Sequence, residues 1–193
     1  MQTTLAEPHV HLWTRDEYYK MAEMGMFGGK HVELIEGRII EMSPMGSLHA
    51  TGVPLAGRIL ENAFGRGFFA RWQMPLDAGE LSEPEPDIAI IRGDVRDFKG
   101  AHPKTAVLIV EIAETSLTYD RTEKASLYAK IGVPDYWILN LIDRQLEVCR
   151  LPIVDVSQTF GFKYAQVTVF GPDDFVSPLS ASEIKIAAAD LLP

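Results

Sequence analysis

Residues 105–140 read TAVLIVEIAETSLTYDRTEKASLYAKIGVPDYWILN, and three patterns follow one another along this stretch. The run AVLIVEIA is almost entirely apolar, as expected for a strand that is covered on both faces. Apolar residues at helical spacing then predict a helix from Asp120 to Ile131, which Asp120 caps and Gly132-Val133-Pro134 terminates. The last part opens a hairpin that turns at Asp143-Arg144. This order favours a mixed sheet flanked by helices over a doubly wound series.

Weaker patterns on either side extend the prediction along the chain. A T-x-x-E capping box at Thr14 predicts a first helix that ends near Met24, before a glycine-rich loop. The central Glu36-Gly37 predicts a tight hairpin within residues 31–42, because such a turn needs a glycine. Residues 51–64 have partly helical spacing, with Pro54 tolerated in a first turn. Strands are expected at residues 68–76, 87–91, 105–112, 163–170 and 184–187.

Size and composition limit the class of protein. A chain of 193 residues suits one domain, which we divide into an N-terminal helix and loop at 1–30 and a core at 31–193. No apolar run approaches the roughly 18 residues of a membrane span. The first residues, MQTTLAEPHVHLW, do not resemble a secretory signal. The single cysteine, Cys149, excludes an internal disulfide and is expected to be an inert strand residue. These features predict a cytoplasmic protein.

The charge balance is acidic, with a net charge of −9 from 18 basic and 27 acidic residues. This counts against a protein that coats nucleic acid with a broad basic surface. The acidic charge does not exclude a metal-dependent nuclease. The active site of such an enzyme concentrates carboxylates, and the bound cations reverse the local electrostatic field. Contact with DNA would then be confined to a small patch.

Two carboxylates on successive predicted strands are the first candidates for chemistry. Asp87 begins the strand PDIAII, and Glu111 interrupts an otherwise apolar strand. A buried carboxylate is costly unless it has a partner or a metal, and two together would suit Mg²⁺ or Mn²⁺. Considered separately, Asp87 could simply begin a strand and Glu111 could lie at an exposed strand end.

Lys124 adds a third group. It shares one helical face with Leu127, Tyr128 and Ile131, and that face should point at the sheet. A lysine that begins the helix face directed at the sheet needs a carboxylate or phosphate partner, unless its side chain extends back to solvent near the helix start. Arg121, one turn earlier, is expected on the same side.

Two further residues could join this set. Glu33 alternates with Val32 and Leu34 in the first hairpin, where a solvated face is the alternative. His49 lies just before the second predicted helix, where a capping or surface role is the alternative. The other histidines, His9, His11, His31 and His102, show no ligand spacing. Zinc-type Cys/His patterns, glycine-rich phosphate loops and serine nucleophile elbows are absent from the sequence.

Together, HVELIEGRIIEMSPMGSLHA, PEPDIAII and residues 107–151 resemble the Uma-two-type restriction endonuclease family of the PD-(D/E)XK superfamily. The similarity runs from about Glu33 to Arg150 and is most specific between Tyr119 and Tyr136. It implies the restriction-endonuclease-like fold, with a central mixed sheet flanked by helices. It also implies a metal-dependent endonuclease that acts on DNA.

The resemblance also implies roles for single residues. Asp87 and Glu111 correspond to metal ligands, and Glu33 and His49 match the family's early acid and histidine. The standard motif has lysine two residues after the glutamate, where this chain has Ala113. The resemblance implies that Lys124, on the following helix, takes that role. Ala50 stands where many members have glutamine.

Three hypotheses remain open at this point. The chain is an Mg²⁺- or Mn²⁺-dependent nuclease, or it is a catalytically inactive module that keeps the fold for interaction or DNA binding. A homodimer through the sheet edge or the first helix is compatible with either. Trp13, Tyr18 and Tyr19 are candidates for such a surface, and covering the core is their alternative role.

Overall fold

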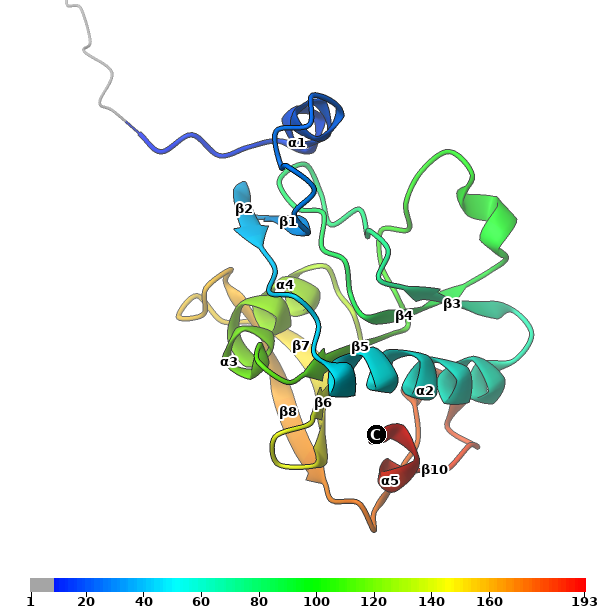
Figure 1. Ribbon diagram of the computed structural model, residues 1–193. Coiled ribbons are helices and arrows are strands. Elements are labelled where there is room, and N and C mark those ends of the chain that lie inside the picture. The colour runs from blue at the N-terminus through cyan, green and yellow to red at the C-terminus, as the bar shows by residue number, and fades with distance from the viewer. Residues whose placement is uncertain (1–8) are drawn as a thin grey trace, which may run out of the picture.

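A six-stranded mixed sheet forms the centre of the molecule in the computed structural model, which describes residues 9–193 (Figure 1). The strand order is β3-β4-β5-β6-β7-β8, and the β5–β6 pair is parallel while the other neighbours are antiparallel. The predicted mixed sheet flanked by helices is therefore confirmed. The strands are β3 (Phe68–Trp72), β4 (Ile88–Arg92), β5 (Leu108–Ala113), β6 (Asp135–Asn140), β7 (Gln145–Val154) and β8 (Phe162–Phe170).

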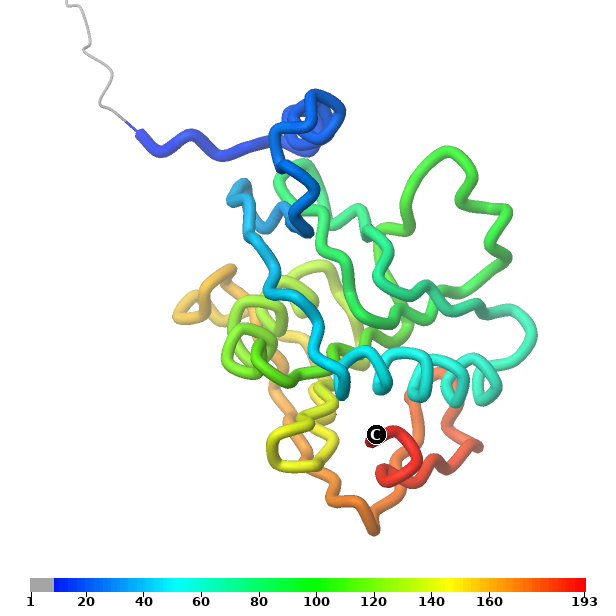
Figure 2. The backbone as a smooth tube through the Cα atoms, viewed as in Figure 1, coloured from blue at the N-terminus to red at the C-terminus, as the bar shows by residue number. Residues whose placement is uncertain are grey.

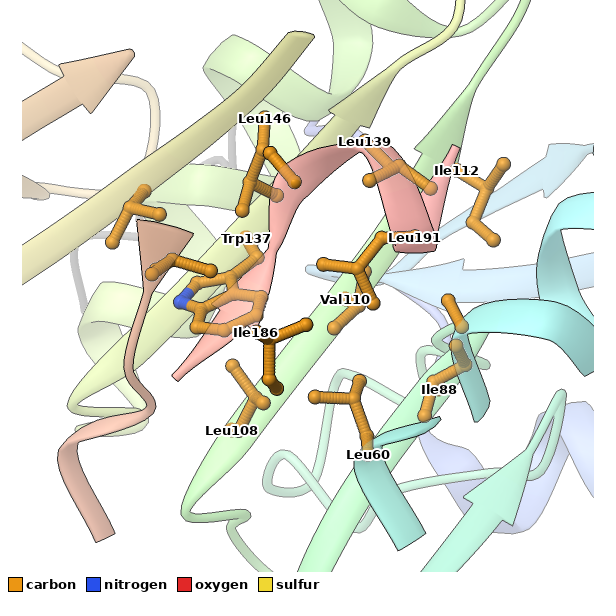
Figure 3. Packing of buried hydrophobic residues seen from close by; sticks show 14 of the residues in the cluster. Leu60, Ile88, Leu108, Val110, Ile112, Trp137, Leu139, Leu146, Ile186 and Leu191 are labelled. Atoms are coloured by element: carbon orange, nitrogen blue, oxygen red, sulfur yellow. The ribbon is translucent and has the colours of Figure 1, made fainter. Parts of the chain in front are cut away.

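Helices cover both faces of this sheet. On one face α2 (Ser47–Phe64) and α5 (Ala188–Leu191) pack over even-numbered residues of β4 and β5, such as Ile88 and Val110. Figure 3 shows this cluster around Trp137 and Leu139. The other face carries α3 (Leu117–Tyr119), a π-helical turn (Asp120–Lys124) and α4 (Ala125–Lys130). Because side chains alternate along a strand, odd-numbered residues of β4 and β5 face this second layer.

The N-terminal part stands at one end of the sheet (Figure 2). Thr14 caps α1 (Arg15–Glu23) with the predicted capping box. The hairpin of β1 (Val32–Ile35) and β2 (Arg38–Glu41) turns at Glu36 and Gly37, whose φ values of 46° and 74° explain the glycine. Tyr18 packs with the hairpin in a small separate cluster. The remaining elements are the short strands β9 (Phe175–Val176) and β10 (Ile186–Ala187), and 3₁₀ turns at Val95–Phe98 and Leu179–Ala181.

Several predicted boundaries were wrong: β5 begins at Leu108 instead of residue 105, β10 begins at Ile186 instead of residue 184, and three further differences bear on the site. The second helix begins at Ser47 instead of residue 51, so Pro54 lies inside the helix and His49 lies in its first turn. The third helical segment begins at Leu117 after Ser116, so Asp120 is an interior residue instead of a cap. Strand β3 ends at Trp72, because Gln73 adopts a φ of 50° that leaves the extended region.

No helix among residues 9–193 is both long and apolar enough to cross a membrane. The start of the chain in which no signal was expected lies partly outside the described residues. Cys149 is a free thiol buried in β7, as expected for a residue of an inner strand.

Candidate functional site

Asp87 and Glu111 face each other on neighbouring strands. The pairing of Ile88 with Val110 in the antiparallel β4–β5 ladder places the preceding Asp87 opposite Glu111. The Asp87 amide donates to Glu111 Oε2 at 3.1 Å, and the Ile112 amide donates to Asp87 Oδ2 at 2.8 Å. Both side chains are buried, with exposed fractions of 8% and 5%. Strand pairing alone therefore brings the two acids together.

Lys124 enters from the helical layer above these strands. Its ammonium lies 3.3 Å from Glu111 Oε1, and its side chain is only 2% exposed. The expected alternative, a lysine that extends to solvent, is not what the structure shows. The π-helical turn of Asp120–Lys124 turns both of its terminal residues inward. Such turns inside α-helices occur frequently at functional sites.

The hairpin supplies a third carboxylate, Glu33. The Lys124 ammonium donates to Glu33 Oε1 at 2.9 Å, and the Glu85 amide donates to the same oxygen at 3.2 Å. Glu33 Oε2 also lies 2.7 Å from the ammonium, so both carboxylate oxygens of Glu33 contact Lys124. Glu33 is 1% exposed, so the predicted alternative of a solvated face is wrong.

His49 and Gln73 both reach Asp87. His49 Nε2 lies 2.8 Å from Asp87 Oδ1, and Gln73 Nε2 donates to the same oxygen at 3.3 Å. Although burial opposes the charged form of His49, the hydrogen bond and charge of Asp87 raise its pKa above the ordinary value. The side chain of His49 thus belongs to the site and not to the surface.

Sequence reasoning missed Asp120, Tyr128 and Gln73. Asp120 is 3% exposed and accepts a hydrogen bond of 2.6 Å from Ser116 Oγ. Tyr128 donates to Glu111 Oε1 at 2.6 Å. Both share the helical face of Lys124, so the spacing could have indicated them. Gln73 gave no sequence signal, because its position depends on the local backbone after β3.

More negative charge gathers here than Lys124 balances. Burial raises the pKa of Glu111 to about 8, against the opposing charge of Lys124. Burial also raises the pKa of Asp120 to about 6, although the Ser116 hydrogen bond opposes this. Burial disfavours the ammonium of Lys124, but Glu111 and Glu33 outweigh that effect and raise its pKa. Both carboxyl shifts favour protonated acids, which is the response to surplus buried charge.

The donor set fits a hard divalent cation. Five carboxylates line one cavity of about 60 Å³, and Lys124 is the one lysine or arginine among its described lining residues. Oxygen-rich sites of this kind suit Mg²⁺ or Mn²⁺. Within residues 9–193, no three Asp, Glu, His or Cys side chains already form a ligand group. The Lys124 ammonium contacts both Glu33 and Glu111.

Other predicted residues lie elsewhere. Arg121 is not on the side of Lys124; it forms a two-point contact with Glu147 at 2.9 and 2.6 Å. His31 lines the cavity and contacts Glu85 at 2.9 Å, while His102 contacts Arg71 outside it. Of the N-terminal aromatic residues, Tyr18 is buried, whereas Trp13 and Tyr19 are 37% and 38% exposed.

Comparisons with known proteins give the fold and the family of the chain. No curated protein matches the chain. A solved structure from Anabaena variabilis ATCC 29413, described as "a putative nuclease belonging to DUF820", is similar with a TM-score of 0.66 and 18% identity. The match covers 92% of this chain and 96% of that one, and at this identity it shows the fold. The Uma2 family model, described as "Putative restriction endonuclease", matches residues 15–189. The chain therefore belongs to the Uma2 family, and this membership supports a nuclease.

Proposed function

We propose that the chain is a divalent-metal-dependent endonuclease that hydrolyses phosphodiester bonds in DNA. The observation that carries the proposal is the convergence of Glu33, Asp87 and Glu111 with Lys124 in one buried cavity. Four separate segments supply these groups, so the cluster does not arise from one local turn. Family membership supports the reaction class.

Glu33, Asp87 and Glu111 would hold Mg²⁺ or Mn²⁺, with Asp120 as a further carboxylate in the same cavity. When bound, such an ion supplies Lewis-acid stabilisation of the charge that develops on the phosphodiester. The surplus of carboxylates over cations favours binding of a divalent ion. Such an ion would replace the protons that the raised pKa values of Glu111 and Asp120 favour.

Lys124 would orient the attacking water and stabilise negative charge at the phosphate. A fixed ammonium in a site with little water stabilises developing charge more strongly than it would in bulk solvent. Tyr128 and Lys124 both bind Glu111 Oε1, which fixes that carboxylate. His49 is held by Asp87 and lies at the edge of the cavity, where it can assist with a proton or a phosphate contact.

The test is cleavage of DNA with Mg²⁺ or Mn²⁺, compared with the same reaction in EDTA. Asp87→Asn should lower the cleavage rate by at least about 10²-fold, because the charge that the metal needs is lost. Asp173→Asn is the matched control, since Asp173 is exposed and lies outside the cavity. Equal rates for wild type and Asp87→Asn would contradict the proposal.

A module without catalysis is the second candidate, because the described residues hold no ready-made ligand group. Calorimetric titration separates the two. Mg²⁺ binding that Asp87→Asn abolishes supports the enzyme, and absence of binding at millimolar Mg²⁺ supports the module. The homodimer stays a prediction, for which the outer strand β8 offers the exposed side chains Val167 and Val169.

A further inference from the structure

The proposed catalytic groups lie below the molecular surface. Asp87, Glu111 and Lys124 are 8%, 5% and 2% exposed, and the cavity that they line holds about 60 Å³. A DNA duplex is stiff over many base pairs, so its phosphates cannot bend far into a recess. A single strand has no such stiffness and can place one phosphate inside.

A second, larger cavity of about 230 Å³ adjoins the first. The two share part of their walls and are therefore neighbours, and we call the larger cavity the side groove. One wall is the segment 40–46 between β2 and α2, and the other is the segment 114–119 after β5. The shared residues are Met42, Ser43, Met45, His49 and Ser116.

The walls of the side groove suit a nucleobase better than a phosphate. Met45, Pro44 and Tyr119 provide apolar and aromatic surface, and Met45 is 55% exposed. Bases stack on such surfaces whatever their sequence.

The charges around the groove argue against a duplex. Of the described residues that line the two cavities, Lys124 is the one lysine or arginine, and it already contacts Glu33 and Glu111. Duplex binding depends on basic side chains that neutralise several phosphates. A single strand has a lower charge density and presents its bases to the wall.

We infer that the side groove receives an unstacked base next to the scissile phosphate, so that the substrate is single-stranded DNA. This rests on the proposed function, because it assumes that a phosphodiester occupies the carboxylate cavity. The groove then selects strands whose bases are free to leave the stack. A paired base inside a duplex would first have to be turned out.

Fluorescence anisotropy of short labelled oligonucleotides tests the inference, with Ca²⁺ in place of Mg²⁺ to limit cleavage. The single strand should bind at least about tenfold tighter than the duplex of the same sequence, since base stacking is available only to the strand. Thr115→Trp, which fills the groove from its exposed wall, should lower affinity for the strand about tenfold. Thr159→Trp, in the exposed loop between β7 and β8, is the matched control and should bind like wild type.

A fully abasic strand of the same length adds a second comparison. Wild type should bind it about tenfold more weakly than the normal strand, and Thr115→Trp should show little difference between the two strands, because the groove no longer meets a base. Equal affinity for strand and duplex, or an unchanged Thr115→Trp, would overturn the inference.

Cleavage assays separate this failure from failure of the proposed function. Faster Mg²⁺-dependent cleavage of duplex than of single strand would overturn the inference and leave the nuclease proposal standing. Absence of cleavage with Mg²⁺ or Mn²⁺, together with strand binding that Thr115→Trp weakens, would overturn the nuclease proposal and leave the groove standing.

Discussion

Two buried carboxylates on opposite faces of the sheet have contrasting environments. Both carboxylate oxygens of Asp135, at the start of β6, accept hydrogen bonds. Trp137 Nε1 and Arg150 Nε donate to one oxygen at 2.7 and 2.8 Å, and the Leu179 amide donates to the other at 2.8 Å. Glu111 instead shares one lysine with Glu33 and lies beside Asp87 and Asp120.

The difference separates a structural ion pair from a candidate site. Around Asp135 one carboxylate meets one guanidinium, which leaves no charge for a ligand to neutralise. Around Glu111 negative charge is in excess, because five carboxylates and one lysine line the cavity. Burial of charge alone does not indicate function; unbalanced burial of charge does.

The largest effect should come from removing the cation of the unbalanced cluster. Lys124→Ala should lower Mg²⁺-dependent cleavage of DNA about 10³-fold, because the ammonium next to the reacting phosphate is lost. Lys130→Ala removes a lysine of the following helix, α4, that pairs with Glu36 at the surface, and its rate should match wild type. A rate for Lys124→Ala equal to that of its control would remove the proposed role.

Removing the cation of the balanced pair should affect stability instead. Arg150→Ala leaves the Asp135 carboxylate buried without its counter-charge, which should lower the free energy of unfolding by about 3 kcal/mol. Urea denaturation measures this, and Mg²⁺ should not restore the loss. Arg96→Ala, at an exposed arginine, should change stability by less than about 0.5 kcal/mol. A loss that Mg²⁺ reverses would show that the two clusters do not differ as described.

The smallest expected effect on cleavage concerns the hydroxyl groups of Tyr128 and Tyr164. Tyr128→Phe removes the donor to Glu111 and should lower both stability, by about 1 kcal/mol, and cleavage, by about fivefold. Tyr164→Phe removes a donor to the Val133 carbonyl and should cost similar stability without changing cleavage. If both variants cleave equally well, Tyr128 has no part in positioning Glu111.

The sequence predicted the sheet type and most elements because local patterns decide them. Apolar runs indicated β4 and β5, and the turns at Glu36-Gly37 and Asp143-Arg144 indicated both hairpins. The start of the helical segment that contains Tyr128 was predicted three residues too late, at Asp120 instead of Leu117. A D-x-x-E pattern at Asp120 is equally compatible with a cap and with an interior turn.

The candidate site was only partly predictable. The acids of the strands and the inward lysine stood out as charged residues within apolar patterns. Asp120 did not stand out, because its place in the capping pattern already accounted for an acidic residue. Arg121 was placed on the wrong side because the expected spacing assumed a regular α-helix, whereas the chain forms a π-helical turn there.

By itself, the sequence determined most of the segments that form strands and helices and showed which charged residues interrupt apolar patterns, because periodicity and apolar content are local properties. The tertiary structure decided that Glu33, which lies far from Lys124 in the chain, is its closest carboxylate. It also decided that the two cavities share His49 in their walls. Contacts of this kind depend on how the hairpin packs against the helical layer, and no local pattern encodes that packing.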